Sequence, residues 1–555
     1  MIGARSPMLG VAYPPEAMLE RYLAAGVLPR ETLAQAYLDS FARHAERTAL
    51  VGPGVNMSYR ELDRLTDRMA AALMRLGAAP LDRAIFQMAN SVELLVATIG
   101  CLKAGVIPVC TLATHRELEI SALGNHAEAK FWFVDGDDEK FDLRAFAAAE
   151  RAAIPSVVQV IVARGAPLAG QLGLHALLER EDAAEAQARV RATVATLDPF
   201  QPAVFQLSGG TTGVSKIIAR FSNDYLSNMR HILAHTGRRQ PEVVFSGGPY
   251  LHNAGFVCHW GPGLLHGSAI LVARDYTEDG LLDAFLEWRP TWAFVPKPLL
   301  LRLVAAKRRR GADLSFLEVV ATLGGQLLIR EETGARPLSV FGMAEGPVMM
   351  TSSFDSVEAT NDTVGRPICP ADELRLVQPG TMQEVAEGEM GELVIRGPYT
   401  LHGYYKADDK NRESFTDGFL RTGDLIARRR VGENVCYQFM GRIKDIVKRA
   451  GETISCEEIE RVVRRIPGIA DVAVVPVSDP VYIERACACL VLARGSSAPT
   501  VAQMGEFLRS NGVAKFKWPE HVQVFEQFPQ TKSGKLSKPQ LREAATARIL
   551  AQSMK

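Results

Sequence analysis

The chain has 555 residues, more than a single hydrophobic core usually supports, so two or more domains are expected. Its composition, 47% hydrophobic and 23% charged, is that of an ordinary globular protein. Lys plus Arg equal Asp plus Glu at 63 each, so the charge balance favours neither a nucleic-acid nor an anionic-membrane partner.

Targeting and redox signals are weak. The N-terminal stretch MIGARSPMLGVAYPPE contains no apolar segment of signal-peptide length. The most apolar window, LLVATIGCLKAGVIPVCTL, contains Lys103 and two glycines, which favours a buried helix-turn-strand over a membrane span. Eight cysteines are too few for a disulfide scaffold and favour buried thiols in a reducing compartment. We therefore expect a cytoplasmic protein.

Strand and helix patterns alternate through most of the chain, which favours an α/β architecture. A clear helix should follow Ser58, because Ser58 and Glu61 form an S-x-x-E capping box and an apolar face then continues to Gly77. Short apolar runs predict buried strands at 131–136, 269–275 and 291–297.

The last part of the chain has the pattern of a small α+β unit. The polar stretch RRRVGENV (428–435) is its most linker-like feature, followed by the helix-like EEIERVVRRI and the strand-like DVAVVPVSD. Cys487 and Cys489 alternate as in a strand, and no second Cys/His cluster accompanies them, so we predict structural thiols on one sheet face. We place the domain boundary near Lys444, between residues 1–443 and 444–555.

The stretch LSGGTTGVSK (207–216) has the composition of a phosphate-binding loop, with glycines that let backbone N–H groups face an anion. It is not a Walker loop, because Lys216 stands three residues after Gly213 and Ile217 replaces the magnesium-binding hydroxyl. A flexible surface loop is the alternative. The residues expected to face phosphate are Ser208, Gly209, Gly210, Thr211, Thr212, Gly213 and Lys216.

The motif SGGTTGVSK resembles the phosphate loop of the adenylate-forming superfamily, which includes acyl- and aryl-CoA ligases, luciferases and the adenylation domains of peptide synthetases. Further motifs of that family follow in its order: FGMAEG (341–346), LRTGDL (420–425), GRIKDIVKRAGETISCEEIE (441–460) and PQTKSGKLSK (529–538). The resemblance implies a large N-terminal domain of layered sheets and helices and a small, mobile α+β C-terminal domain. It also implies an enzyme that joins a carboxylic acid to AMP, releases pyrophosphate and passes the acyl group to a thiol.

The resemblance also assigns single residues. Lys535 resembles the catalytic lysine, whose ammonium would bridge the attacking carboxylate and the α-phosphate. Glu345 would hold Mg²⁺ as a hard oxygen ligand, although a carboxylate at a helix N-terminus is the alternative. Asp424 would accept the ribose hydroxyls, with a strand-end aspartate as the alternative, and Arg442 would reach the ribose or phosphates. Lys444 matches the hinge about which the C-terminal domain rotates.

Two further segments are expected to line the nucleotide and acyl sites. Phe341 would offer a flat face to adenine, although a buried core aromatic is an equal alternative from the sequence. The remaining residues expected around the nucleotide and the acyl group are Gly324, Gly325, Gln326, Gly342, Met343, Ala344 and Val348.

Several phrases resemble the aryl-acid branch, typified by salicylate- and 2,3-dihydroxybenzoate-AMP ligases of siderophore assembly: QLSGGTTG, SNDY (222–225), FGMAEG with Ala344, and RGPYTLHGYY (396–405). The resemblance places the acid pocket at PYLHNAGF (249–256). His252 would pack against the carboxylate, and Asn253 would donate to it or to an ortho hydroxyl, unless the backbone satisfies that amide. The apolar thiol of Cys258 leans toward salicylate over a catechol.

The acid and the thiol acceptor stay open. Ala254-Gly255 stand where that branch usually has an aromatic residue followed by proline, which would remove bulk and keeps anthranilate-like or bicyclic acids possible. The acceptor is expected to be the phosphopantetheine of a separate carrier protein, because no carrier-type serine motif follows the C-terminal domain. An aryl-CoA ligase is the alternative; the run 307–310 is its candidate CoA-phosphate site, although a solvated helix end is favoured for it.

Other classes are disfavoured. A non-enzymatic nucleotide-binding regulator does not require the intact Lys535, Glu345 and Asp424, and no G-x-S-x-G elbow indicates a hydrolase. The expected cofactors are ATP and Mg²⁺, with CoA or carrier-bound phosphopantetheine as acceptor. No nucleic-acid or membrane partner is expected, and the chain should be a monomer or homodimer.

Overall fold

The structure is a computed structural model that describes residues 2–553 except 209–214, 239–241, 323, 450–451, 480–482, 512, 514 and 532–534. The chain forms two compact units. The first unit comprises Met1–Glu373 and Ile395–Leu420, and the second comprises Leu374–Val394 and Arg421–Lys555. The domain boundary near Lys444 stays a prediction.

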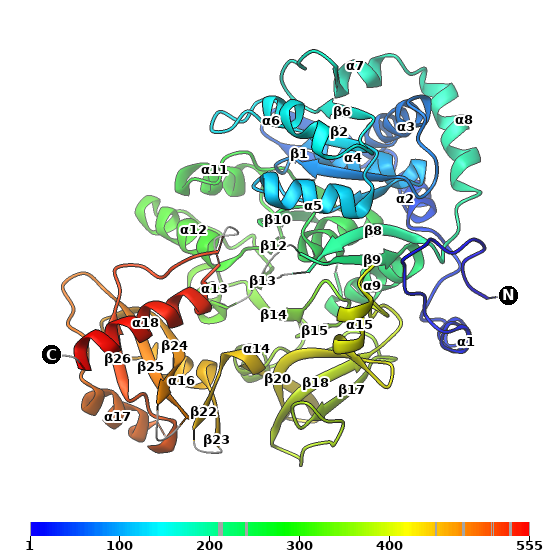
Figure 1. The fold of residues 1–555 in the computed structure, drawn as a ribbon. Coiled ribbons are helices and arrows are strands. Elements are labelled where there is room, and N and C mark those ends of the chain that lie inside the picture. Colours follow the sequence, from blue (N-terminus) through cyan, green and yellow to red (C-terminus); the bar gives the residue numbers. More distant parts are fainter. Residues whose placement is uncertain are drawn as a thin grey trace. The chain divides into compact units, whose positions relative to one another are not determined.

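Two large sheets dominate the first unit (Figure 1). Among the described residues, a nine-stranded sheet has the order β16 (Arg366–Pro367), β15 (Val348–Met350), β14 (Arg336–Gly342), β13 (Val319–Thr322), β12 (Trp292–Phe294), β10 (Val243–Ser246), β11 (Ala269–Leu271), β1 (Thr48–Gly52) and β2 (Val55–Ser58). A seven-stranded sheet has the order β7 (Gln171–Gly173), β6 (Gln159–Val162), β5 (Phe131–Val134), β3 (Arg83–Gln87), β4 (Ile107–Val109), β8 (Pro202–Leu207) and β9 (Ile217–Phe221).

Most neighbouring strands in both sheets are parallel, so each sheet needs helices on both faces. The helices between the two sheets share one core with them: α2 (Leu33–Arg43), α3 (Tyr59–Arg75), α4 (Val92–Ala104), α9 (Ser222–Thr236) and α10 (Gly261–His266). The outer face of the seven-stranded sheet packs on α5 (Glu117–Ala127) and α6 (Leu143–Glu150). The outer face of the nine-stranded sheet packs on α11 (Glu278–Trp288), α12 (Lys297–Arg310) and α13 (Gln326–Thr333).

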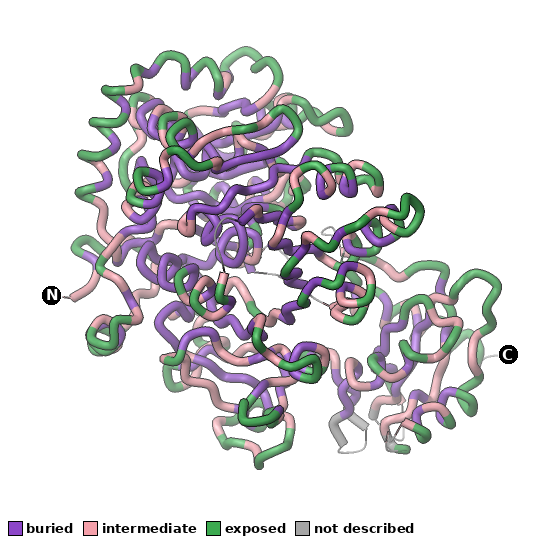
Figure 2. The backbone as a smooth tube through the Cα atoms, turned by 180° about the vertical axis from the view of Figure 1, so that it is seen from behind, coloured by how far each residue is buried: buried purple, intermediate pink, exposed green. Residues whose placement is uncertain are grey.

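Strand β3 shows how side-chain alternation builds these layers. Ala84 and Phe86 join the central core, whereas Ile85 between them joins the outer core. Figure 2 shows the same pattern at the level of the backbone, with buried segments through the sheets and exposed segments along the peripheral helices. The first unit is therefore a stack of helix, sheet, helix, sheet and helix layers, as the alternation of patterns predicts.

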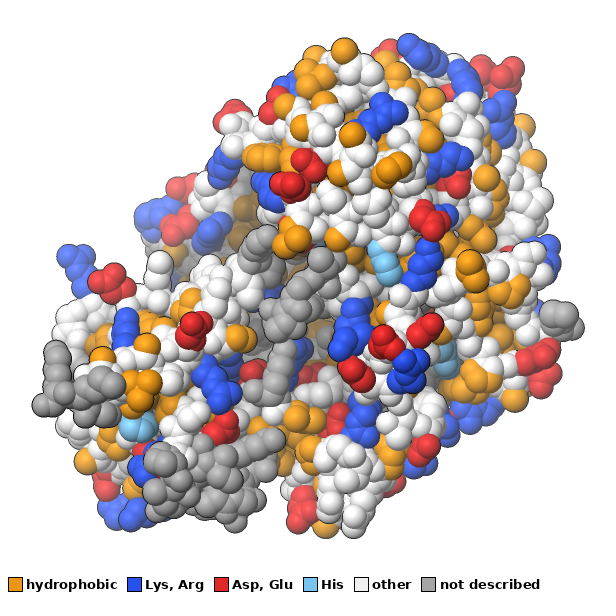
Figure 3. All heavy atoms as spheres, viewed as in Figure 1, with side chains coloured by type: hydrophobic (Ala, Val, Ile, Leu, Met, Phe, Trp, Pro, Cys, Tyr) orange, Lys and Arg blue, Asp and Glu red, His pale blue; other side chains and the backbone are white. Residues whose placement is uncertain are grey.

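Peripheral helices of the first unit complete its surface: α1 (Glu16–Ala24), α7 (Leu174–Glu179), α8 (Ala183–Val194), α14 (Val357–Asp362) and α15 (Asp408–Ser414). Lys, Arg, Asp and Glu side chains are interspersed over the face drawn in Figure 3, as the balanced charge of the chain predicts. No helix in the described part of the chain is both long and apolar enough to cross a membrane.

Several predicted elements are confirmed. Helix α3 begins after Ser58, and the reciprocal capping box with Glu61 is present. The apolar window around Lys103 forms α4 and β4, and the predicted strands at 131–136, 269–275 and 291–297 are β5, β11 and β12. All eight cysteines are free and buried.

A smaller sheet forms the body of the second unit. Its strands are β23 (Glu452–Ser455), β22 (Ile446–Arg449), β25 (Ile483–Leu492), β24 (Ile469–Asp479) and β26 (His521–Val524). One face packs on α16 (Cys456–Val463) and α17 (Val501–Ser510), and the other on α18 (Lys538–Ser553). Cys487 and Cys489 lie in the same core beneath α18, which confirms the predicted common face.

The linker-like interpretation of RRRVGENV was wrong. This segment closes an antiparallel hairpin between β20 (Phe419–Val431) and β21 (Asn434–Arg442), in which Val431 is paired with Asn434. Gly432 supplies the left-handed turn conformation, with φ of 58°. Arg428 and Arg430 resemble linker residues only because every second side chain of this strand faces water. The hairpin belongs to a further sheet, separate from the small sheet above. This sheet also contains β17 (Glu373–Val377), β18 (Met390–Arg396) and β19 (Phe415–Thr416).

Candidate functional site

The expected site residues fall into two sets, one in each unit. In the first unit, the predicted phosphate loop connects β8 to the antiparallel β9. The Ser208 N–H donates to the Lys216 carbonyl at 2.9 Å, and the Lys216 N–H donates to Ser208 Oγ at 3.0 Å. These two hydrogen bonds hold the first and last residues of the loop next to each other. Gly209, Gly210, Thr211, Thr212 and Gly213 themselves lie outside the described residues.

Tyr404 lies between two of the expected site residues, Lys216 and Glu345. Lys216 Nζ lies 3.9 Å from the centroid of the Tyr404 ring, and Tyr404 Oη donates to Glu345 Oε1 at 3.0 Å. Burial lowers the pKa of Lys216, while the Glu345 carboxylate opposes that shift. Burial and the same carboxylate raise the pKa of Tyr404. The loop cation and the predicted magnesium ligand are thus bridged by a protonated phenol.

Tyr404 was not predicted as a site residue, although it lies in the family phrase RGPYTLHGYY. The sequence feature that could have drawn attention to it is the pair of adjacent tyrosines, Tyr404 and Tyr405, at the end of that phrase. Its contact with Glu345 joins positions 59 residues apart, so only the folded chain brings them together.

The FGMAEG motif forms the tight connection between β14 and β15, in which Gly342 is paired with Val348. The Leu401 N–H donates to the Glu345 carbonyl at 2.7 Å, which ties this connection to the segment of Tyr404. Phe341 is only partly buried at the end of β14, so it is not a fully enclosed core aromatic.

Arg220 anchors the same connection and was also missed from the sequence. Its guanidinium Nη1 donates to the Ala344 carbonyl at 3.1 Å, and its Nε donates to Asp224 Oδ1 at 3.1 Å. Arg220 is fully buried, and burial raises the pKa of Asp224 to about 6, against the opposing charge of Arg220. A buried ion pair on β9 and α9 therefore supports the turn that bears Met343, Ala344 and Glu345.

Gly324 and Gly325 have φ of 100° and 95°, a region that favours glycine. Both are partly exposed, and α13 starts at Gln326, whose Nε2 donates to Ser339 Oγ at 2.8 Å. Partly exposed backbone groups lie at this position, and its role in the adenine and acyl sites stays a prediction.

The segment predicted to form the acid pocket leads into a wide helical turn, Ala254–Trp260. His252 is exposed, whereas Asn253 is buried and accepts a hydrogen bond from Tyr225 Oη at its Oδ1, at 2.9 Å. Cys258 is buried, and desolvation raises the pKa of its thiol to about 12, so it stays uncharged. Val348 is buried in β15, and its predicted contact with the ring of the acid stays a prediction.

Gly255 has a structural reason to be small. A Cβ atom there would lie 2.6 Å from the Pro249 carbonyl oxygen, so the backbone itself excludes a side chain. Ala254 is only partly buried. The glycine at 255 therefore has a steric reason, whereas the effect of Ala254 on the size of the acid stays open.

The second unit contains the other set of expected residues. Asp424 on β20 is paired with Arg442 on β21, and Arg442 Nε lies 3.0 Å from Asp424 Oδ1. Desolvation and the positive charge of Arg442 lower the pKa of Lys535. Asp424, Arg442 and Lys535 therefore share one electrostatic neighbourhood.

The predicted hinge directly follows this group. Lys444 lies in the short helical turn Ile443–Asp445, two residues after Arg442. The structure describes the backbone of Lys444 and not its side chain.

The basic run 307–310 at the end of α12 is neutralised by carboxylates. Lys307 and Arg308 bind Glu332, and Arg309 and Arg310 bind acidic residues of α11. This supports the interpretation of the run as a solvated helix end, because each cation already has an anionic partner within the unit.

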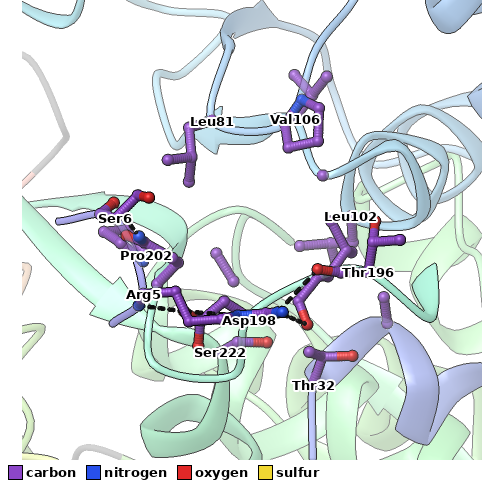
Figure 4. Close-up of a pocket in the computed structure, with 16 residues that line it drawn as sticks. Arg5, Ser6, Thr32, Leu81, Leu102, Val106, Thr196, Asp198, Pro202 and Ser222 are labelled. Carbon is purple, nitrogen blue, oxygen red and sulfur yellow. Dashed lines mark hydrogen bonds and ion pairs between the residues drawn. The ribbon is translucent and has the colours of Figure 1, made fainter. Parts of the chain in front are cut away.

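A cavity in the first unit lies apart from the expected site residues (Figure 4). Its lining includes Arg5, Leu81, Leu102 and Asp198, and none of the expected site residues in the described part of the chain contributes to it. Two of these lining residues are bonded to each other, because the Arg5 N–H donates to Asp198 Oδ2 at 2.7 Å. The described residues also contain no group of three or more His, Cys, Asp or Glu side chains able to enclose a metal ion.

The chain matches two family models and several known proteins. The family model described as AMP-binding enzyme matches residues 38–405, and the model described as AMP-binding enzyme C-terminal domain matches residues 458–535. The chain is 37% identical over 543 residues to Triostin synthetase I of Streptomyces triostinicus, covering 96% of this chain and 98% of that protein.

It is 32% identical over 545 residues to the 2,3-dihydroxybenzoate-AMP ligase of Bacillus subtilis (strain 168), covering 97% of this chain and 98% of that protein. Among solved structures, apo MbtA from Mycobacterium smegmatis matches with a TM-score of 0.72 at 29% identity, covering 96% of this chain and 98% of that chain. The expected α/β fold, with a large N-terminal and a small C-terminal part, is confirmed.

Proposed function

The chain belongs to the AMP-binding enzyme family, in the aryl-acid branch of the adenylate-forming ligases, and we propose that it activates a salicylate-like or 2,3-dihydroxybenzoate-like acid. In the first step a carboxylate oxygen attacks the α-phosphorus of ATP, an acyl-adenylate forms and pyrophosphate leaves. In the second step a phosphopantetheine thiol of a separate carrier protein displaces AMP and keeps the acyl group as a thioester.

One observation carries this proposal: Lys216, Tyr404 and Glu345 meet at the clamped ends of a glycine-rich loop. A triphosphate needs cations and donors along its length, and a single carboxylate is enough for Mg²⁺ that also binds phosphate oxygens. Mg²⁺ held by Glu345 would neutralise phosphate charge, while Lys216 and the loop would hold the departing pyrophosphate. Tyr404 would fix the direction of the Glu345 carboxylate.

Three residues of the second unit complete the proposed reaction. Asp424 would accept hydrogen bonds from the ribose hydroxyls. Arg442 would break its ion pair with Asp424 and bind the ribose or the phosphates instead. Lys535 would bring its ammonium between the attacking carboxylate and the α-phosphate, where negative charge accumulates in the transition state. Rotation about Lys444 would then replace this arrangement with one that admits the thiol.

In the acid pocket, Asn253 and His252 would meet the carboxylate end, and Cys258 and Val348 would contact the ring. The neutral thiol of Cys258 supports a ring edge that carries hydrogen rather than hydroxyl, which favours salicylate. The free, buried cysteines support a reducing compartment, and we expect the cytoplasm.

Acid-dependent exchange of labelled pyrophosphate into ATP tests the first step. A panel of salicylate, 2,3-dihydroxybenzoate, anthranilate and benzoate should give the fastest exchange with an ortho-hydroxy acid. Lys535→Ala should reduce exchange by about a hundredfold or more, because it removes charge stabilisation in the transition state. Lys515→Ala, at an exposed lysine of the same unit, is the matched control and should exchange normally.

Unchanged exchange in Lys535→Ala would contradict the assignment of the catalytic lysine. The acceptor is tested separately by comparing CoA with a phosphopantetheine-bearing carrier protein in thioester formation. Faster transfer to CoA would overturn the carrier-protein part of the proposal and leave the adenylation step intact.

A further inference from the structure

A buried relay of polar side chains links the predicted acid pocket to the FGMAEG turn. It consists of Gln206 on β8, Tyr225 on α9 and Asn253. Gln206 and Asn253 are almost fully buried, and Tyr225 is fully buried. Buried polar groups are costly unless they are hydrogen-bonded, so the partners of each atom determine how the relay is arranged.

The Leu251 carbonyl sets the direction of the relay. A carbonyl only accepts, so the group 3.1 Å from it must be the Gln206 amide nitrogen, Nε2. The same Nε2 lies 2.9 Å from Tyr225 Oη and donates to it. The phenol oxygen therefore accepts from Gln206, and its own proton is available for a third group.

That third group is Asn253. Tyr225 Oη lies 2.9 Å from Asn253 Oδ1 and donates to it, since an amide NH₂ could not accept this proton. Burial raises the pKa of Tyr225 well above its ordinary value, so the phenol stays protonated. Among the described residues, the NH₂ group of Asn253 then meets only the Met343 carbonyl, at a long 3.5 Å.

We infer that Gln206 and Tyr225 are positioning residues that hold Asn253 as a hydrogen-bond donor in the acid pocket, so that acids with an acceptor beside the carboxyl group are selected over ortho-amino acids. This inference rests on the proposed function of the pocket. Gln206 and Tyr225 are added to the acid site, and they determine which end of the Asn253 amide faces the acid. Without them, Asn253 could present either its oxygen or its NH₂ group.

The chemistry of the two acid classes gives the selectivity. The hydroxyl proton of salicylate is donated internally to its own carboxylate, which leaves the phenolic oxygen as an acceptor for Asn253. Anthranilate also uses one N–H internally, but its nitrogen lone pair is delocalised into the ring and its second N–H would face the Asn253 donor. Two facing donors repel, so the relay disfavours the ortho-amino acid.

The test is the selectivity for salicylate over anthranilate in pyrophosphate exchange, measured as kcat/KM for each acid. Tyr225→Phe frees the Asn253 amide to turn over. We expect the selectivity to fall by about tenfold, chiefly through a higher KM for salicylate. The reason is that the Asn253 NH₂ group is no longer held toward salicylate, so its hydrogen bond to the acid is weakened.

A double-mutant cycle separates positioning from general stability. If Tyr225 acts through Asn253, then Tyr225→Phe should change selectivity little in an Asn253→Ala background. The matched control is Tyr59→Phe, which removes another buried hydroxyl of the same unit, one that donates to the Ser268 carbonyl at 2.6 Å. This control should keep the wild-type selectivity.

The outcomes distinguish the inference from the proposed function. Exchange with wild-type selectivity in Tyr225→Phe, or additive effects in the cycle, would overturn the inference alone. No exchange by the wild-type enzyme with any aromatic acid would overturn the proposed function, and the inference with it.

Discussion

At the scale of single residues, the second unit shows how a lysine is prepared for charge stabilisation. Lys535 lies near Arg442, and this positive neighbour adds to desolvation in lowering its pKa. The Thr531 N–H donates to the Lys535 carbonyl at 2.7 Å, and the Lys535 N–H donates to Thr531 Oγ1 at 3.2 Å, so the backbone at this position is held. A positioned cation with a lowered pKa is expected at a site that receives anionic substrates.

The first prediction at this scale concerns pH. Exchange needs the protonated form of Lys535, so kcat/KM should fall on the alkaline side at a lower pH than an ordinary lysine would give. Arg442→Gln removes the positive neighbour and uncovers the negative charge of Asp424, both of which raise the pKa of Lys535. The alkaline limb of the kcat/KM profile should therefore move to higher pH in this variant, even where its height is reduced.

The position of the limb, not the rate, is the quantity to compare. Arg464→Gln, at an exposed arginine of the same unit, should leave the limb where it is. A limb that does not move in Arg442→Gln would contradict the electrostatic link between Arg442 and Lys535.

At the scale of elements, helices α3 and α4 are joined by a buried ion cluster in the core between the two sheets. Lys103 on α4 is completely buried, and its Nζ lies 2.5 Å from Asp63 Oδ1, 2.6 Å from Asp67 Oδ1 and 2.9 Å from Thr66 Oγ1 on α3. Burial raises the pKa of Asp67, against the opposing charge of Lys103. The lysine in the apolar window thus satisfies two carboxylates of the neighbouring helix.

Lys103→Met should strongly destabilise the first unit, because it leaves Asp67 buried without its cation. The expected loss is about 3–5 kcal/mol in the free energy of unfolding. The thermal midpoint of the variant should fall clearly below that of the wild-type protein. The variant Lys103→Met with Asp63→Asn and Asp67→Asn should recover part of the loss, since it removes the unpaired charges. A midpoint equal to the wild-type value in Lys103→Met would contradict this account.

At the scale of the whole molecule, the expected site residues are divided between the two units. Lys216, Glu345 and Asn253 belong to the first unit, and Asp424 and Lys535 to the second. The predicted hinge at Lys444 lies within the second unit, between Asp424 and Lys535 in the chain, so a rotation there would move Lys535 relative to Asp424. Activity should therefore be sensitive to the backbone freedom of that one residue.

The prediction at this scale is that Lys444→Pro affects the two half-reactions unequally. Proline fixes φ near −65°, which restricts the change of backbone angles that a hinge requires. We expect either pyrophosphate exchange or thioester formation to be retained and the other to be lost by at least about tenfold. Lys444→Ala, which removes the side chain but keeps the backbone free, should retain both. An equal reduction of both half-reactions in Lys444→Pro would contradict the hinge.

Elements with local signals were predictable from the sequence. The capping box at Ser58, the alternation of Cys487 and Cys489 and the short apolar strands depend on residues a few positions apart, and each was confirmed. The family was also predictable from the sequence, because each of its motifs is a run of neighbouring residues and the motifs follow in a fixed order. The hairpin at RRRVGENV was missed because a half-exposed strand and a linker have the same polar composition.

Tertiary structure decided which distant residues meet. Tyr404 between Lys216 and Glu345, Arg220 beneath Ala344, and the close backbone approach at Gly255 join segments that no local pattern connects. The direction of the Asn253 amide depends on the Leu251 carbonyl through two other side chains. Hydrogen bonds and burial are properties of the folded neighbourhood, so the chemistry of the residues was encoded in the sequence, whereas their orientation was set only by packing.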